Sequence, residues 1–184
     1  MGEWVSLSGL VLVLLAGVGL WLSWTANRLD RMHHRIDVAR ETLRAQLLRR
    51  SGVTLEVAVT EALDPSSRLL LLDAAHRARN AGPEDFETAE SRLSEALRAV
   101  LDDPQAVRAL RDPVADLALA SLVDELAQAC AKVELARRFH NDVVVSARSL
   151  RSRRRVRWLH LAGRAGPLQT VDLDDEPPPA LTSP

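Results

Sequence analysis

Two pairs of residues have the spacing that a metal site in a helical protein would need. Asp30 stands three positions before His33, and Asp73 stands three positions before His76. Residues three apart share one face of a helix, so each pair could offer a carboxylate and an imidazole. Di-iron bundles use Glu-x-x-His twice and two further glutamates on facing helices, which are not evident here. Exposed polar faces are the simpler interpretation, and we expect no metal and no other cofactor.

The chain lacks the local patterns that specify common enzyme chemistry. It has no His-Glu-x-x-His sequence, no Gly-rich phosphate loop and no nucleophile signature. Cys130 is the single cysteine, so it can form neither an internal disulfide nor a cysteine-rich metal site. Small apolar neighbours favour a buried, inert thiol. We therefore predict a protein that is not an enzyme.

A polar cluster lies in the middle of residues 133–158, a stretch without proline or glycine. We expect its side chains to contact a second helix, because buried polar groups at a helix seam need partners and fix the register of the helices. The predicted partner is Asp37, in contact with Arg137, Arg138 or Asn141. His140 occupies a seam position, and two interpretations stay open: a packed histidine with one hydrogen bond, or a pH sensor or ligand.

The end of the same stretch is strongly basic. Its cationic and aromatic residues are Arg148, Arg151, Arg153, Arg154, Arg155, Arg157 and Trp158. Arginines beside Trp and Leu suit the headgroups of an anionic lipid leaflet, which is the contact that we predict. A solvated helix end and a nucleic-acid patch are the alternatives. A net charge of −1 and the lack of interleaved aromatics make us expect no nucleic-acid partner.

The composition predicts that these residues are carried by helices alone. Of the 184 residues, 47% are hydrophobic but only 3% are aromatic. Leu and Ala dominate the apolar residues, and period-two clusters of β-branched residues are missing. We expect an all-α antiparallel bundle of about four helices, of which the first and the last are long.

Asp-Pro or Gly-Pro pairs should mark the starts of the later helices. Asp is a good N-cap and Pro a good first helical residue. Such pairs stand at 64–65, 82–83, 103–104 and 112–113. The expected helices cover about 25–62, 66–80, 83–100 and, after a brief turn or helix at 104–111, 113–158. The last of these carries a heptad seam of apolar residues, which needs a partner along its length.

The residues before the bundle have the character of a membrane anchor. Residues 4–24 contain no charged side chain, and 21 helical residues span about 30 Å, the thickness of a bilayer core. Arginines follow this segment, whereas Glu3 precedes it, so the positive-inside rule predicts an outside N-terminus. We expect a single-pass plasma-membrane protein with a cytoplasmic bundle at 25–162. The acidic, Pro-rich residues 163–184 are predicted to be disordered.

Two stretches resemble signatures of the LemA family. Residues 27–50 read NRLDRMHHRIDVARETLRAQLLRR, similar to the family's N-x-L start, V/I-D-x-A step and Q-L-x-R-R close. Residues 136–141 read ARRFHN, similar to the family's A-R-R-F/Y-Y-N, with His140 where a Tyr is usual. The resemblance covers roughly residues 1–145. It implies a single-pass membrane protein with a cytoplasmic antiparallel helical bundle, and it implies no established reaction.

Two functions therefore stay open. One is a membrane-tethered scaffold or adaptor that binds partner proteins through its helices. The other is a sensor or organiser of anionic lipid that uses the basic end of the last helix. Homo-oligomerisation is also possible, although the uncharged segment contains no GxxxG motif.

Overall fold

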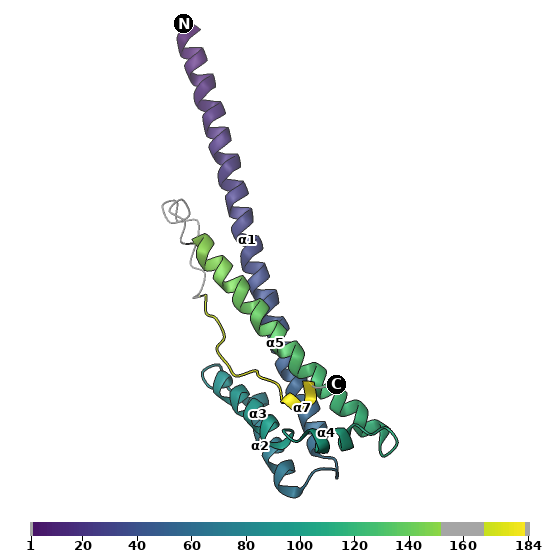
Figure 1. The fold of residues 1–184 in the computed structure, drawn as a ribbon. Helices are drawn as coiled ribbons and strands as arrows, with labels where there is room; N and C mark the ends of the chain where they lie inside the picture. Colours follow the sequence, from purple (N-terminus) through teal and green to yellow (C-terminus); the bar gives the residue numbers. More distant parts are fainter. Residues whose placement is uncertain (1, 152–167, 183–184) are drawn as a thin grey trace. The chain divides into compact units, whose positions relative to one another are not determined.

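A computed structural model of the chain describes residues 2–151 and 168–182, which form helices, turns and irregular segments (Figure 1). Contacts divide the chain into two compact units. The smaller unit comprises Met1–Val38 and Val143–Gln169, and the larger comprises Ala39–Asp142 and Thr170–Pro184. The predicted all-α class is confirmed for the described part of the chain.

Two long helices and several short ones make up this structure. The elements are α1 (Gly2–Ala58), α2 (Pro65–Asn80), α3 (Phe86–Val100), α4 (Pro104–Leu110), α5 (Leu117–Arg151) and α7 (Pro179–Thr182). Helix α1 covers both the predicted membrane segment and the predicted first helix of the bundle. Helices α2 and α3 pack against each other (Figure 1).

Two of the four predicted helix starts are confirmed. The Asp64 carboxylate accepts hydrogen bonds from the backbone N–H groups of Ser66 and Ser67 at the start of α2. Asp103 caps α4 in the same way through Gln105, at 2.8 Å. Each cap satisfies N–H groups that have no partner within the helix, so these Asp-Pro pairs begin helices as expected.

The other two predicted starts are wrong by a few residues. The chain after Gly82 first forms a turn, and α3 begins at Phe86. The Asp112 carboxylate closes another turn by accepting from the backbone N–H of Val114, at 2.9 Å. Asp116 is the residue that caps α5. A carboxylate that accepts from the residue two positions on forms an Asx-turn, which competes with helix initiation.

Most of the larger unit surrounds one apolar core. This core contains buried side chains from the end of α1, from α2, α3, α4 and α7, and from the first half of α5. Cys130 belongs to it, as expected for a small buried thiol, and burial raises the pKa of that thiol. A thiol with a raised pKa carries little of the reactive thiolate at neutral pH.

A second cluster confirms the antiparallel packing of α1 and α5 within the larger unit. Leu43 and Leu47 of α1 lie with Val133 and Ala136 of α5 in this cluster. Further along α1, Arg49 forms an ion pair with Glu125, which lies earlier in α5. Residue numbers thus rise along one helix as they fall along the other, as Figure 1 also shows.

The predicted seam of α5 is buried over most of its described length. Its buried members are Leu119, Leu126, Ala129, Val133, Ala136, His140 and Ala147. Leu122 and Val143 are only half-buried, because Val123 and Val144 next to them take the fully buried positions. The buried face is therefore shifted by one residue from the predicted seam at these two points.

The predicted membrane segment, 4–24, lies in α1, and many of its side chains are outside the described residues. Among the parts of the chain that the structure describes, no helix is long and apolar enough to cross a membrane.

The predicted disorder of the C-terminal residues is wrong for residues 168–182. These residues pass α3 and end in α7 beside α4 (Figure 1). Leu173, Ala180 and Leu181 are buried, and the acidic side chains pair with arginines. Proline and negative charge prevent this segment from forming its own core, but they do not prevent it from binding to one that already exists.

Candidate functional site

The feature with the most specific chemistry is the surface that holds the C-terminal segment, residues 170–182. We call this surface the tail-binding surface. It consists of Ser91, Ser94 and Arg98 of α3 and Arg137 and Asn141 of α5.

Asn141 fixes the start of the segment through its backbone. The side-chain amide of Asn141 donates to the carbonyl of Val171 and accepts from the N–H of Val171, both at 2.9 Å. An asparagine side chain carries an NH2 donor group and a carbonyl acceptor side by side, which match the two backbone groups of one extended residue. The contact therefore binds the backbone of the segment and does not depend on the identity of its side chain.

Two serines of α3 hold the backbone of Asp174 in a similar way. The N–H of Asp174 donates to the Ser91 hydroxyl at 3.0 Å, and the Ser94 hydroxyl donates to the Asp174 carbonyl at 2.6 Å. Ser91 and Ser94 are three residues apart, so they lie on the same face of α3. Both backbone groups of Asp174 are therefore satisfied by the bundle.

The two neighbouring aspartates of the segment bind different helices. Arg98 of α3 holds the Asp174 carboxylate with both terminal nitrogens of its guanidinium. Arg137 of α5 binds Asp175 with Nε at 2.6 Å and Nη2 at 2.9 Å. Successive side chains of an extended chain point in opposite directions, so one carboxylate faces α3 and the next faces α5.

These ion pairs shift the protonation equilibria of their members. The hydrogen bond from Arg98 holds the pKa of Asp174 below its usual value, and the same bond raises the pKa of Arg98. The hydrogen bond to Asp175 likewise raises the pKa of Arg137. Both pairs have the two-point geometry that makes an arginine selective for a carboxylate.

The end of the segment is anchored by apolar contacts. Ala180 and Leu181 of α7 belong to the main core of the larger unit. Arg111 donates from Nη2 to the Leu181 carbonyl at 2.8 Å, and Arg98 donates to the Glu176 carbonyl at 2.9 Å. The intervening prolines have no backbone N–H, so the extended chain leaves no N–H donor without a partner there.

A buried arginine lies directly behind this surface. Arg50 of α1 is 1% exposed, and it donates to Glu90 Oε2 at 2.7 Å and to the Ser94 hydroxyl at 2.9 Å. Burial raises the pKa of Glu90, and the charge of Arg50 offsets part of that effect. Because Ser94 also donates to Asp174, this serine links the buried pair to the C-terminal segment.

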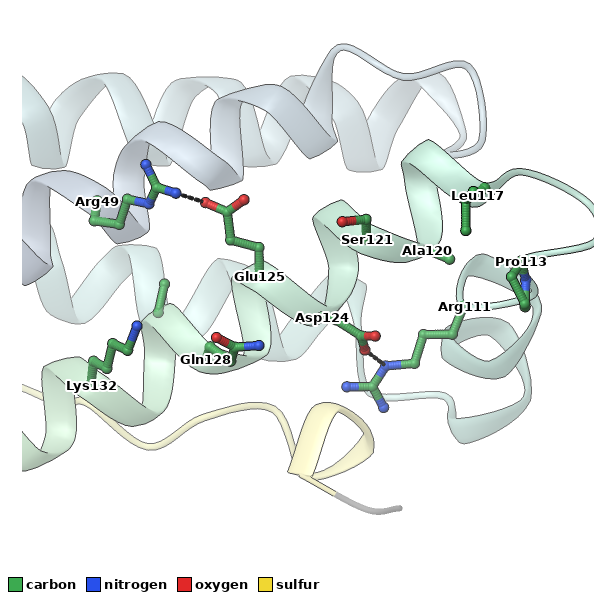
Figure 2. Close-up of a pocket in the computed structure, with 11 residues that line it drawn as sticks. Arg49, Arg111, Pro113, Leu117, Ala120, Ser121, Asp124, Glu125, Gln128 and Lys132 are labelled. Carbon is green, nitrogen blue, oxygen red and sulfur yellow. Dashed lines mark ion pairs between the residues drawn. The ribbon is translucent and has the colours of Figure 1, made fainter.

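A pocket of about 630 Å³ lies beside the first turns of α5 (Figure 2). Two ion pairs cross it, Arg49 with Glu125 and Arg111 with Asp124, the second at 2.9 Å. Figure 2 shows Lys132 and Gln128 further along the same helix. The lining thus carries three cations and two carboxylates, and two of the cations are paired.

The polar residues predicted at 137–141 form specific contacts, but the partners that the structure gives them do not include Asp37. Arg137 pairs with Asp175, Asn141 binds Val171, and Arg138 forms an exposed ion pair with Glu134 one turn earlier. Asp37 itself is exposed, and its contact across the helices stays a prediction. His140 is 3% exposed, and the choice between a packed histidine and a sensor or ligand stays open.

The predicted basic cluster is described only at its beginning. Arg148 donates from Nε to the carbonyl of Leu168 at 2.8 Å, and Arg151 is the last residue of α5. The remaining members, Arg153, Arg154, Arg155, Arg157 and Trp158, lie outside the described residues. Contact of this cluster with lipid stays a prediction.

The Asp-x-x-His pairs are accounted for in part. Asp73 accepts from Arg77 Nε at 2.8 Å, which is an exposed pair along one face of α2. The side chain of His33 lies outside the described residues. In the described parts of the chain, no group of three or more His, Cys, Asp or Glu side chains is placed to hold a metal ion.

Sequence reasoning missed the α3 half of the tail-binding surface. Ser91, Ser94 and Arg98 lie at the spacing of one helix face, in a segment assigned only to core packing. Charge gave no signal for this half, because α3 carries three glutamates and two arginines and is not a basic helix.

No family model, curated protein or solved structure matches this chain. The LemA resemblance therefore depends on the two quoted signatures, and the function has to be argued from the contacts above.

Proposed function

We propose that this protein is a membrane-anchored helical scaffold or adaptor that binds partner proteins through its bundle. The observation that supports this function best is the tail-binding surface, on which α3 and α5 together hold an extended segment of the chain. Asn141 and the two serines bind its backbone, and Arg98 and Arg137 bind its carboxylates. These are the contacts by which a helical surface binds a peptide.

The proposal includes the anchor and the orientation argued from the sequence. Residues 4–24 would cross the plasma membrane with the N-terminus outside, and the arginines that follow would keep the bundle in the cytoplasm. We also propose that the chain is LemA-like, on the strength of residues 27–50 and 136–141.

Site-specific photo-cross-linking in native membranes tests the scaffold function. Leu69 of α2 and Leu135 and Phe139 of α5 are large, exposed apolar side chains of the bundle. A photoreactive residue is placed at each of these positions in turn, and at Leu15 as a control in the proposed anchor. We expect discrete protein adducts from at least one bundle position. Adducts with lipid alone, or none from any bundle position, would contradict the scaffold.

The second candidate function is binding of anionic lipid by the basic residues 148–157, supported by the six arginines in that stretch. Each arginine near an anionic surface adds at most about 1 kcal/mol of attraction. A fragment of residues 25–184 should then sediment with anionic liposomes, and added salt should weaken the binding. Gln at Arg153, Arg154, Arg155 and Arg157 should abolish sedimentation, and an unchanged result would exclude this function.

A further inference from the structure

We infer that the tail-binding surface is a site for an extended acidic segment of a partner protein, and that the chain's own residues 170–182 are its tethered competitor. This inference rests on the proposed scaffold function and adds the chemistry of the partner. The partner segment has two apolar side chains two residues apart, followed by two consecutive carboxylates.

The backbone contacts make the site tolerant of other sequences. Asn141 binds both backbone groups of Val171, and Ser91 and Ser94 bind both backbone groups of Asp174. Every residue except proline offers the same N–H and carbonyl pair in an extended conformation. A segment from another protein can therefore form these four hydrogen bonds whatever side chains it carries at the two positions.

The side-chain contacts define what the site selects. Val171 and Leu173 pack on the cluster formed by α1 and α5, and Asp175 follows on the same side of the segment, against Arg137. Asp174 points the other way, to Arg98. This alternation has the period of an extended chain. It selects the pattern apolar, any residue, apolar, acid, acid.

The arginines give this selection its chemical specificity. Each guanidinium meets its carboxylate at two nitrogen atoms, a geometry that neutral side chains cannot match. Asp175 is buried, so replacing its carboxylate also leaves Arg137 without its partner in a partly desolvated position. Acidic segments are therefore bound in preference to neutral ones.

The chain's own segment keeps this site occupied because it is tethered. A tethered ligand acts at an effective concentration of about millimolar, so a free segment of equal affinity competes poorly with it. Weakening the resident segment opens the site to binding in trans. Because Ala180 and Leu181 are embedded in the core, a suitable probe is the peptide of residues 169–178, which excludes α7.

Fluorescence anisotropy of this labelled peptide tests the inference with the full chain in detergent or nanodiscs. The chain carrying Asp174→Asn and Asp175→Asn should bind the peptide at least about tenfold more tightly than the unaltered chain. If this double variant does not fold, Asp175→Asn alone should give a smaller gain in the same direction. A peptide with the same two substitutions should lose binding.

A charge exchange separates direct contact from an indirect effect. Adding Arg137→Glu to the double variant should abolish binding of the normal peptide and allow binding of a peptide carrying Asp175→Arg. Circular dichroism checks that each variant is helical. Equal affinity of the double variant and the unaltered chain for the peptide, or binding that ignores Arg137→Glu, overturns the inference.

Failure of this experiment is distinguishable from failure of the scaffold function. Protein adducts at Leu69, Leu135 or Phe139 together with absent peptide binding would leave a scaffold that uses another surface. Exchange of residues 170–182 between two copies of the chain, seen as a dimer that the double variant loses, would overturn the assignment of the site to a separate partner.

Discussion

Helix α3 carries two arginine–carboxylate pairs that differ in depth. On its inner side Glu90 pairs with Arg50, and both side chains are at most 5% exposed. On its outer side Arg98 pairs with Asp174, with exposures of 25% and 34%. Ser94 touches both pairs, through Arg50 and through the backbone of Asp174. The two pairs use the same chemistry, and the difference between them is access to water.

Because of that difference, the pKa values of the two carboxylates, Glu90 and Asp174, shift in opposite directions. Burial raises the pKa of Glu90, because the buried charge loses its hydration. The hydrogen bond from Arg98 lowers the pKa of Asp174, because the half-exposed carboxylate keeps part of its hydration and gains a cation. The inner pair thus resists separation, whereas water can replace each partner of the outer pair. This favours a fixed contact inside and an exchangeable one outside.

Arg50→Met is expected to have the largest effect, because it removes the cation of the buried inner pair together with its hydrogen bond to Ser94. It leaves Glu90 buried without its cation, a situation that costs about 3–5 kcal/mol of unfolding free energy. Urea unfolding of the full chain in detergent, followed by circular dichroism, measures the loss.

The matched control is the double variant Arg50→Met with Glu90→Leu. Replacing a whole buried pair by apolar residues of similar volume is often neutral. We expect the double variant to recover most of the stability lost by the single one. A double variant as unstable as Arg50→Met would show that the pair is not an independent unit, and that Arg50 also acts through Ser94.

Much of the fold was predictable because it follows from local chemistry. The Asp-Pro starts of α2 and α4 and the apolar seam of α5 are properties of short stretches, and the structure confirms them. The end of α1 at Ala58 was placed too late, at about residue 62, because no proline or glycine lies close enough to mark it. Thr60 bonds back to the Val57 carbonyl at 2.8 Å, a local contact that favours a turn.

Only the α5 half of the tail-binding surface was predictable from the sequence. Arg137 and Asn141 stood out as polar residues in an apolar helix, and they do make specific contacts. Their partners lie 30 residues or more away along the chain, in a segment whose composition is that of a disordered tail. Composition describes what a segment can do alone. It does not reveal that another part of the chain supplies the arginines and the apolar surface.

Substitutions in the outer contacts should lower the stability less than those in the inner pair. Among the outer contacts, the loss should be larger for the more buried side chain. Asp175→Asn removes the charge that Arg137 binds, which should cost about 1–2 kcal/mol and speed amide hydrogen exchange in residues 170–176. Glu134→Gln is the matched control, because its partner Arg138 neighbours Arg137 and is exposed. Such exposed pairs contribute about 0.5 kcal/mol or less. Equal effects of the two substitutions would show that the segment is held by its apolar residues alone.

The smallest expected effect is a difference in pH dependence between the two pairs. The raised pKa of Glu90 means that its contribution to stability is full below its ordinary pKa and declines as the pH rises through the folded value. The lowered pKa of Asp174 has the opposite sign: its contribution is present above its ordinary pKa and is lost as the pH falls through the folded value. Melting temperatures are compared between the unaltered chain, Glu90→Gln and Asp174→Asn, from about pH 7 to pH 3, the range around both ordinary values. On acidification, the unaltered chain should gain stability relative to Glu90→Gln and should lose its advantage over Asp174→Asn. If melting temperature changes with pH in the same way in all three proteins, burial does not distinguish the electrostatics of the two pairs. The distinction between a fixed inner contact and an exchangeable outer one would then have no electrostatic basis.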